Sequence, residues 1–160
     1  MVDKDKCKEI AKILRLEHCQ CYSDCLCYMR GTRCLGTLRF SINGQKFRSP
    51  IPREIELSFE KNKKGHYICL GRILVFEEEG DKLFNALFAA GLEANSPTAV
   101  IGFASPSLRE IYFASYTMLP FDFAVKVKSV FQAIKSWRTC QSIYDSISCK
   151  CNLCSGKHKK

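Results

Sequence analysis

The sequence predicts a single α+β domain in which helices flank an antiparallel sheet. Two observations indicate this class. Residues 54–60 alternate apolar and polar side chains, which is typical of a strand with one buried and one solvated face. Residues 5–16 instead carry apolar residues at helical spacing, and the turn signal at residues 105–107 joins two further strand-like runs into a hairpin. At 160 residues the chain has the length of one domain.

Composition narrows the function classes. The apolar fraction of 46% is ordinary for a globular protein, and no run approaches the roughly 20 apolar residues that span a bilayer. Residues 1–12 lack the apolar core of a signal peptide, so we expect a cytoplasmic protein without membrane insertion. The net charge of +9 is spread along the chain, apart from short basic runs at 61–64 and 157–160, which favours solvated surface charge over a nucleic-acid site.

The N-terminal part combines a predicted helix with a cysteine-rich segment. Residues 5–16 place Cys7, Ile10, Ala11 and Leu14 on one face. Residues 19–34 then carry five of the eleven cysteines of the chain in the order C-x-C-x3-C-x-C, followed by Cys34. This segment is either a metal or redox site or a strand or loop that happens to be rich in cysteine, and the second interpretation is favoured.

We accordingly expect no metal and no other cofactor. The candidate metal ligands, should that expectation fail, are the cysteines of the two clusters: Cys19, Cys21, Cys25, Cys27, Cys149, Cys151 and Cys154. Without a signal peptide, these thiols are expected to be reduced.

Three strands are predicted in the first half of the chain. Residues 37–42 alternate apolar and polar side chains and run into Asn43-Gly44, a strong turn signal. The next strand covers residues 54–60, and a third covers 66–76 after a turn. Residues 77–80 are interpreted as an acidic linker.

The second half reads as helix, hairpin and helix. Asp81 can cap a helix that carries Leu83, Phe84, Leu87 and Phe88 and ends at Gly91. Strands are predicted over residues 98–104 and 109–118. Leu119-Pro120 breaks the second, and Asp122 opens a long helix with an apolar stripe that reaches Trp137 and continues towards Ile147. The domain therefore covers residues 1–147, with a cysteine-rich insertion at 17–36, and residues 148–160 form a basic tail.

The run from Leu83 to Arg138 resembles the C-terminal half of the class I type III secretion chaperones. The features that carry the resemblance are Leu87 and Asn95, the hairpin around Pro106, the Leu119-Pro120 break and the closing Trp137-Arg138. With the upstream half it extends over most of residues 5–140. The resemblance implies an αβββαββα fold and a homodimer in the bacterial cytoplasm. It also implies that the protein binds the N-terminal segment of one or more secreted effectors, keeps it soluble and delivers it to the secretion ATPase or sorting apparatus.

These implications predict specific surfaces. The effector would bind apolar margins of the sheet and the first helix: Ile10, Leu14, Phe40, Ile42, Leu57 and Phe59. The dimer interface would use the second helix: Phe84, Leu87 and Phe88. No catalytic motif is present, so we expect a binding protein rather than an enzyme. The alternative, motivated by the cysteines and the charge, is a zinc-binding nucleic-acid or adaptor module.

Overall fold

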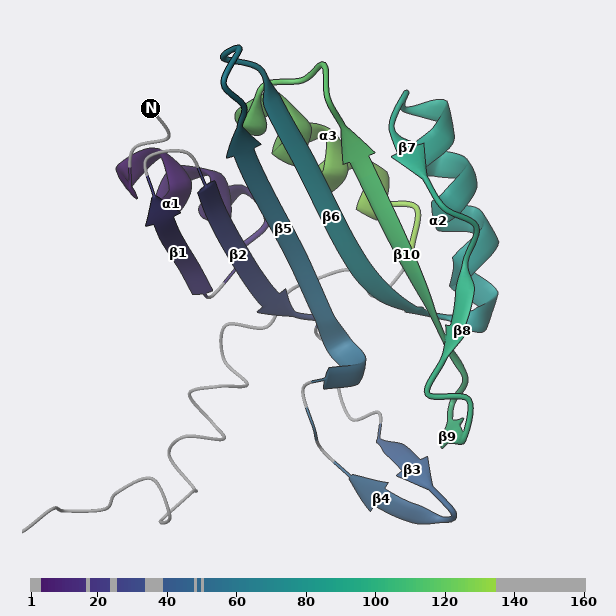
Figure 1. Ribbon diagram of the computed structural model, residues 1–160. Helices are drawn as coiled ribbons and strands as arrows, with labels where there is room; N and C mark the ends of the chain where they lie inside the picture. The colour runs from purple at the N-terminus through teal and green to yellow at the C-terminus, as the bar shows by residue number, and fades with distance from the viewer. Residues whose placement is uncertain are drawn as a thin grey trace, which may run out of the picture.

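The computed structural model describes residues 4–16, 18–23, 26–33, 39–47, 49 and 51–134. These residues form an α+β fold in which three helices pack on one face of a twisted antiparallel sheet, as the sequence predicts (Figure 1). The opposite face of the sheet carries no helix among the described residues. The two faces therefore have different environments.

The main sheet is built from neighbouring antiparallel strands. Its central strands are rich in apolar residues, and β5 alternates apolar with polar side chains along its length. In spatial order the strands are β1 (His18–Ser23), β2 (Leu26–Thr32), β5 (Glu54–Lys61), β6 (Tyr67–Phe76), β10 (Leu108–Ser115) and, both paired with β10, β7 (Glu93–Ala94) and β8 (Thr98–Val100).

The helices α1 (Lys4–Ile13), α2 (Glu77–Ala89) and α3 (Pro120–Phe131) bury their apolar stripes against the sheet. The inward alternation of β5 is confirmed. At the centre of this core, Gly71 leaves room for the ring of Phe113 on the neighbouring strand, because a Cβ at position 71 would overlap that ring and Leu57. The packing of Phe113 and Leu57 therefore requires glycine at position 71.

A second, three-stranded sheet lies at one end of the molecule (Figure 1). It consists of β4 (Gln45–Phe47), β3 (Phe40–Ile42) and β9 (Ala104–Ser105), and the short 3-10 helix η1 (Ile51–Arg53) follows β4. The predicted turn at Asn43-Gly44 is confirmed, and both residues have positive φ. The prediction that residues 37–42 supply the first strand of the main sheet is wrong, because β1 and β2 of the cysteine-rich segment take that place.

The acidic residues 77–80 form the first turn of α2 rather than a linker. Carboxylates are favourable at a helix N-terminus, and Glu79 accepts a hydrogen bond of 3.0 Å from the backbone N–H of Phe76. The same carboxylate accepts two hydrogen bonds, of 3.0 and 2.9 Å, from the buried guanidinium of Arg33. Burial lowers the pKa of Arg33, and the Glu79 charge opposes that shift. A long-range ion pair thus fixes where the helix begins.

Other boundaries differ by a few residues. The predicted strand over 98–104 is interrupted, and its two ends belong to different sheets as β8 and β9. Helix α3 begins at Pro120, which is accepted in the first turn because that position needs no backbone donor. The predicted continuation through Trp137 and the tail at 148–160 lie outside the described residues. No described helix is both long and apolar enough to cross a membrane.

Candidate functional site

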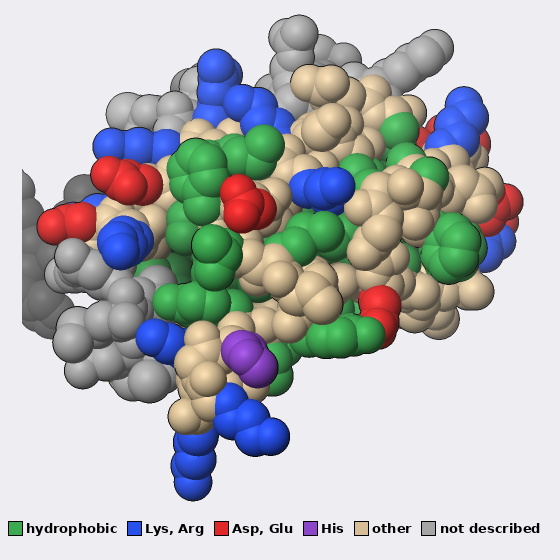
Figure 2. All heavy atoms as spheres, turned by 90° about the horizontal axis from the view of Figure 1, so that it is seen from above, with side chains coloured by type: hydrophobic (Ala, Val, Ile, Leu, Met, Phe, Trp, Pro, Cys, Tyr) green, Lys and Arg blue, Asp and Glu red, His purple; other side chains and the backbone are tan. Residues whose placement is uncertain are grey.

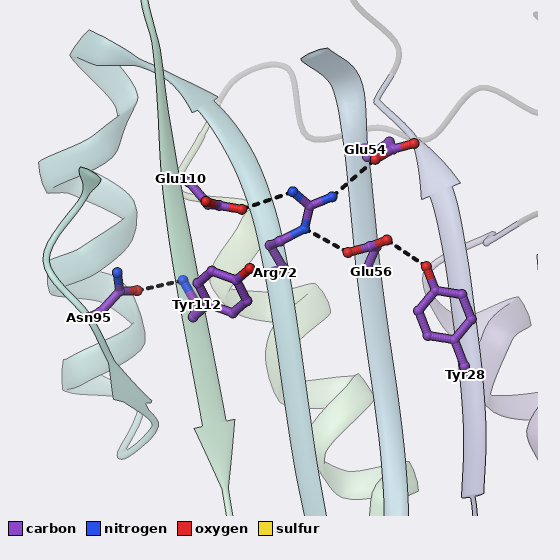
Figure 3. A network of polar contacts seen from close by, with 7 residues as sticks. All are labelled: Tyr28, Glu54, Glu56, Arg72, Asn95, Glu110 and Tyr112. Atoms are coloured by element: carbon purple, nitrogen blue, oxygen red, sulfur yellow. Dashed lines mark hydrogen bonds and ion pairs between the residues drawn. The ribbon is translucent and has the colours of Figure 1, made fainter. Parts of the chain in front are cut away.

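A network of charged side chains occupies the centre of the sheet face that carries no helix, which we call the open face (Figure 3). Arg72 on β6 forms ion pairs with carboxylates on both neighbouring strands. Its partners are Glu54 at 3.0 Å, Glu56 at 2.6 Å and Glu110 at 2.8 Å. The hydroxyl of Tyr28 on β2 donates to Glu56 at 2.5 Å. One arginine therefore holds β5, β6 and β10 together from the solvent side.

This network shifts the pKa values of its members. Partial burial alone would raise the pKa of Glu56, but hydrogen bonds from Tyr28 and Arg72 outweigh burial and lower it. Partial burial and the hydrogen bond to Glu56 raise the pKa of Tyr28 to about 12. Partial burial alone would lower the pKa of Arg72, but the carboxylates of Glu110 and Glu56 outweigh burial and raise it. The centre of the open face thus sets three carboxylates against one guanidinium, and this excess of negative charge opposes the binding of an anionic ligand.

Apolar side chains instead gather at one end of the open face and continue onto the end of the molecule. Ile68 and Leu70 on β6 are 47% and 42% exposed, although their strand is central. Tyr116 and Leu119, in the connection between β10 and α3, are 64% and 59% exposed. Phe121 in the first turn of α3 is also exposed. We call these five residues the apolar band.

Two grooves lie beside three members of this band, which are Tyr116, Leu119 and Phe121. The first, of about 310 Å³, lies between α1 and the start of α3 and is lined by Ile10, Tyr67, Leu119, Pro120 and Phe121, with Lys6 and Glu9 beside them. The second, of about 370 Å³, is lined by residues 65–67 and 116–119, so it shares Tyr67 and Leu119 with the first. Figure 2 looks onto the end of the molecule that is uppermost in Figure 1 and shows hydrophobic side chains gathered there between charged ones.

The structure places most of the predicted client-binding residues in the interior. The expectation that they form exposed margins is wrong for Leu14, Phe40, Leu57 and Phe59, which are at most 1% exposed. The helices cover more of the sheet than the sequence suggested, and Phe40 on β3 packs against Phe47 and Phe76. The expectation is also wrong for Ile10, which is buried at 5% exposure although it lines the first groove. Ile42 alone among the six is exposed, in the β3–β4 hairpin.

The predicted dimer residues on α2 are not equivalent. Leu87 is fully buried in the core, and Phe84 packs against the core while remaining partly accessible. Phe88, the next residue after Leu87, is 73% exposed. Of the three residues, only Phe88 has a largely free side chain, so a surface on α2 would be centred there.

Among the cysteines, the structure adds Cys7 to two members of the predicted cluster, Cys19 and Cys27. Cys7 of α1 and Cys27 of β2 are joined as a disulfide, with Cα atoms 6.2 Å apart. The Sγ of Cys19 on β1 lies 3.9 Å from that of Cys27. Burial, together with the Cys21 thiol, raises the pKa of Cys19, and Lys8 opposes this. The sequence analysis omitted Cys7 because it lies outside the dense cluster.

The remaining cysteine candidates divide into two groups. Cys21 lies on β1 directly opposite Cys27. Cys25, Cys149, Cys151 and Cys154 lie outside the described residues. The pairing of Cys7 with Cys27 also differs from the expectation that the thiols are reduced.

Sequence reasoning also missed the apolar band. It interpreted Leu119-Pro120 as a break between elements and did not consider that the apolar residues around it could form a surface. The signal was present, because residues 116–121 contain four large apolar or aromatic side chains in a connection, where polar residues are more usual.

Comparison of the chain with protein-family models, with curated proteins and with solved structures found no match.

Proposed function

We propose that this protein is an effector-binding chaperone of the class I type III secretion kind, which acts as a homodimer in the bacterial cytoplasm. It holds an unfolded segment of a secreted protein in extended form and delivers it to the secretion apparatus. The observation that carries the proposal is the apolar band. Five exposed apolar side chains, with grooves beside three of them, are typical of a surface that binds a partner.

The order of elements supports the same proposal. When β1, β7 and the small sheet are set aside, the described chain reads as α1, then β2, β5 and β6, then α2, then β8 and β10, then α3. This is the order αβββαββα that the resemblance implies. Both β1 and β2 lie in the cysteine-rich segment 17–36, so the first strand of this order comes from that segment rather than from residues 37–42.

An extended segment fits the surface physically. The band has members on β6, in the β10–α3 connection and in the first turn of α3, and two grooves that share Tyr67 and Leu119 lie beside the last three of them. An extended chain places a side chain on one side at every second residue, so it can fill successive shallow grooves. The edge strands β1 and β8 also offer backbone hydrogen-bonding groups on their outer sides, to which a client strand could add.

A second candidate function, nucleic-acid binding, is favoured by one observation. Tyr22 and Tyr28 lie side by side on the open face, with ring centroids 6.4 Å apart, and Arg30 lines the same shallow depression. Aromatic and basic residues on a sheet can stack and pair with single-stranded nucleic acid. However, Glu54 and Glu56 lie on the adjacent strand of this face, where they would repel a phosphate backbone. The client-binding proposal is therefore preferred.

The test begins with capture of the client from the native cell by a tagged full-length chain. Leu119→Asp and Phe121→Asp place a charge in the apolar band, where it should abolish capture because a desolvated, unpaired charge opposes apolar binding. Both side chains are more than half exposed, so the melting temperature should change little. The matched control is Phe103→Asp, since Phe103 is even more exposed, at 72%, but lies next to β9 at the other end of the molecule.

Retention of client by both band variants would contradict the proposal. So would binding that disappears at moderate salt and extends to arbitrary DNA or RNA, which would instead support the nucleic-acid candidate. The captured protein should be a secreted one, bound through its N-terminal segment. Truncation of that segment should remove the binding.

The dimer is tested separately. Light scattering should give about twice the chain mass of 18.2 kDa, and Phe88→Asp should reduce it to one chain mass without unfolding the protein. Leu87→Asp is expected to unfold the chain, because Leu87 is in the core rather than at an interface. A wild-type monomer at tens of micromolar would contradict the homodimer.

A further inference from the structure

Three cysteine sulfurs converge at the edge of the sheet where α1 packs on the β1–β2 hairpin. Cys7 comes from α1, Cys19 from β1 and Cys27 from β2, and their Sγ atoms all lie within 4.8 Å of one another. Cys7 and Cys27 have no exposed surface, whereas Cys19 is partly accessible. Residues 20 positions apart in the chain are thus gathered around one point.

The spacing of Cys19 and Cys27 suits a thiolate-bound metal ion, whereas Cys7 and Cys27, which are bonded to each other, must separate on reduction. Zinc–sulfur bonds of about 2.3 Å in a tetrahedron separate neighbouring sulfurs by about 3.8 Å. The Sγ atoms of Cys19 and Cys27 are 3.9 Å apart. A disulfide between Cys7 and Cys27 bonds two of the three sulfurs and does not explain why the third lies beside them. A metal ion could be coordinated by all three.

We propose that Cys7, Cys19 and Cys27, with the Cys7–Cys27 pair reduced, form a binding site for Zn²⁺. Reduction supplies two electrons and two protons to the pair and gives two thiols. Metal binding then releases the three thiol protons to water, and three thiolates around Zn²⁺ carry a net charge of −1. Lys8, which acts electrostatically on Cys19, lies close enough to offset that charge.

A fourth cysteine, Cys21, lies near this group, although its sulfur is not among the three that lie within 4.8 Å of one another. This residue is directly opposite Cys27 in the β1–β2 register and two positions from Cys19 on the same strand, so its side chain shares their face. The site fastens the first helix to an edge hairpin. Because an edge strand has only one neighbour in the sheet, metal binding should contribute most to the stability of this corner.

The experiment uses the full chain purified in the presence of a water-soluble phosphine, which is oxidised to the phosphine oxide as it reduces the disulfide. Elemental analysis after dialysis should give one zinc per chain. Cys7→Ser, Cys19→Ser and Cys27→Ser should each lose stoichiometric zinc. The matched control is Cys69→Ser, because Cys69 is a buried free thiol on β6 outside the cluster. It should retain the zinc.

Two measurements on the unmodified chain keep the test independent of folding in the variants. X-ray absorption at the zinc edge should count at least three sulfur ligands, and a chelator should lower the melting temperature. Absence of zinc from the reduced protein would overturn the proposal. So would zinc that survives all three substitutions but is lost when Cys149, Cys151 and Cys154 are replaced together.

Discussion

The two faces of the main sheet are stabilised in different ways. On the helix-covered face, Ile55, Leu57 and Phe59 of β5 are buried in a continuous apolar core. On the open face, the alternate residues Glu54 and Glu56 of the same strand pair with Arg72. The alternating sequence of β5 therefore serves two purposes. Burial of its apolar residues stabilises the fold, and its paired charges leave a face accessible to partners.

The apolar band begins at the end of the open face where the outward-pointing side chains are no longer charged. Ile68 and Leu70 follow the open-face alternation of β6 but are apolar, and nothing among the described residues covers them fully. Towards the other end of the same strand, Leu74 is buried and Phe76 stacks on Phe40 of the small sheet. One end of the open face is thus covered by the small sheet, whereas Ile68 and Leu70 at the other end remain exposed.

The sharpest test of the comparison uses neighbouring residues of β5 that point to opposite faces. Leu57→Asp should unfold the protein, since an unpaired charge in the core costs about 4 kcal/mol or more against a typical total stability of about 5–15 kcal/mol. Ser58→Asp, one residue along and on the open face, should cost about 1 kcal/mol or less. Chemical denaturation monitored by circular dichroism measures both. Similar losses for the two variants would contradict the division between the faces.

A smaller effect is expected at Gly71 on the covered face. Gly71→Ala should lower the free energy of unfolding by about 1–3 kcal/mol, because the added methyl group must displace the Phe113 ring or Leu57. Gly102→Ala is the control, since a Cβ there meets no atom within 4 Å. Equal stability of the two variants, measured by thermal denaturation, would show that the core at Gly71 is looser than described.

The smallest expected effect concerns the open face and depends on pH. The folded state lowers the pKa of Glu56, so its ionised form stabilises the fold above the ordinary glutamate pKa of about 4.3. This contribution should disappear as the pH falls through the lowered value. Glu56→Gln should cost about 1 kcal/mol at neutral pH and nothing at the acid end. Denaturation curves at several pH values measure the difference, which a pH-independent cost would contradict.

Several features could be predicted from the sequence because they depend on neighbours along the chain. The stripe of α1, the alternation of β5 and the Asn43-Gly44 turn each need only local geometry, and all three are confirmed. Their burial follows from the same periodicity, since apolar residues at one spacing share one face. The coarse α+β class follows from these elements.

Only the tertiary structure determined which segments that are distant in the sequence contact one another. The cysteine-rich segment could have been a loop or a strand, and only its pairing with β5 makes it part of the main sheet. Arg33 fixes the start of α2 across 46 residues of sequence, and Cys7 meets Cys19 and Cys27 only because α1 folds back onto β1. Such contacts depend on strand register and chain closure, which local periodicity does not specify. For the same reason, the apolar pattern of the sequence identified residues that build the core, but we predicted the binding surface at several of these same residues. The exposed surface consists of the residues left uncovered once the helices and the small sheet have packed.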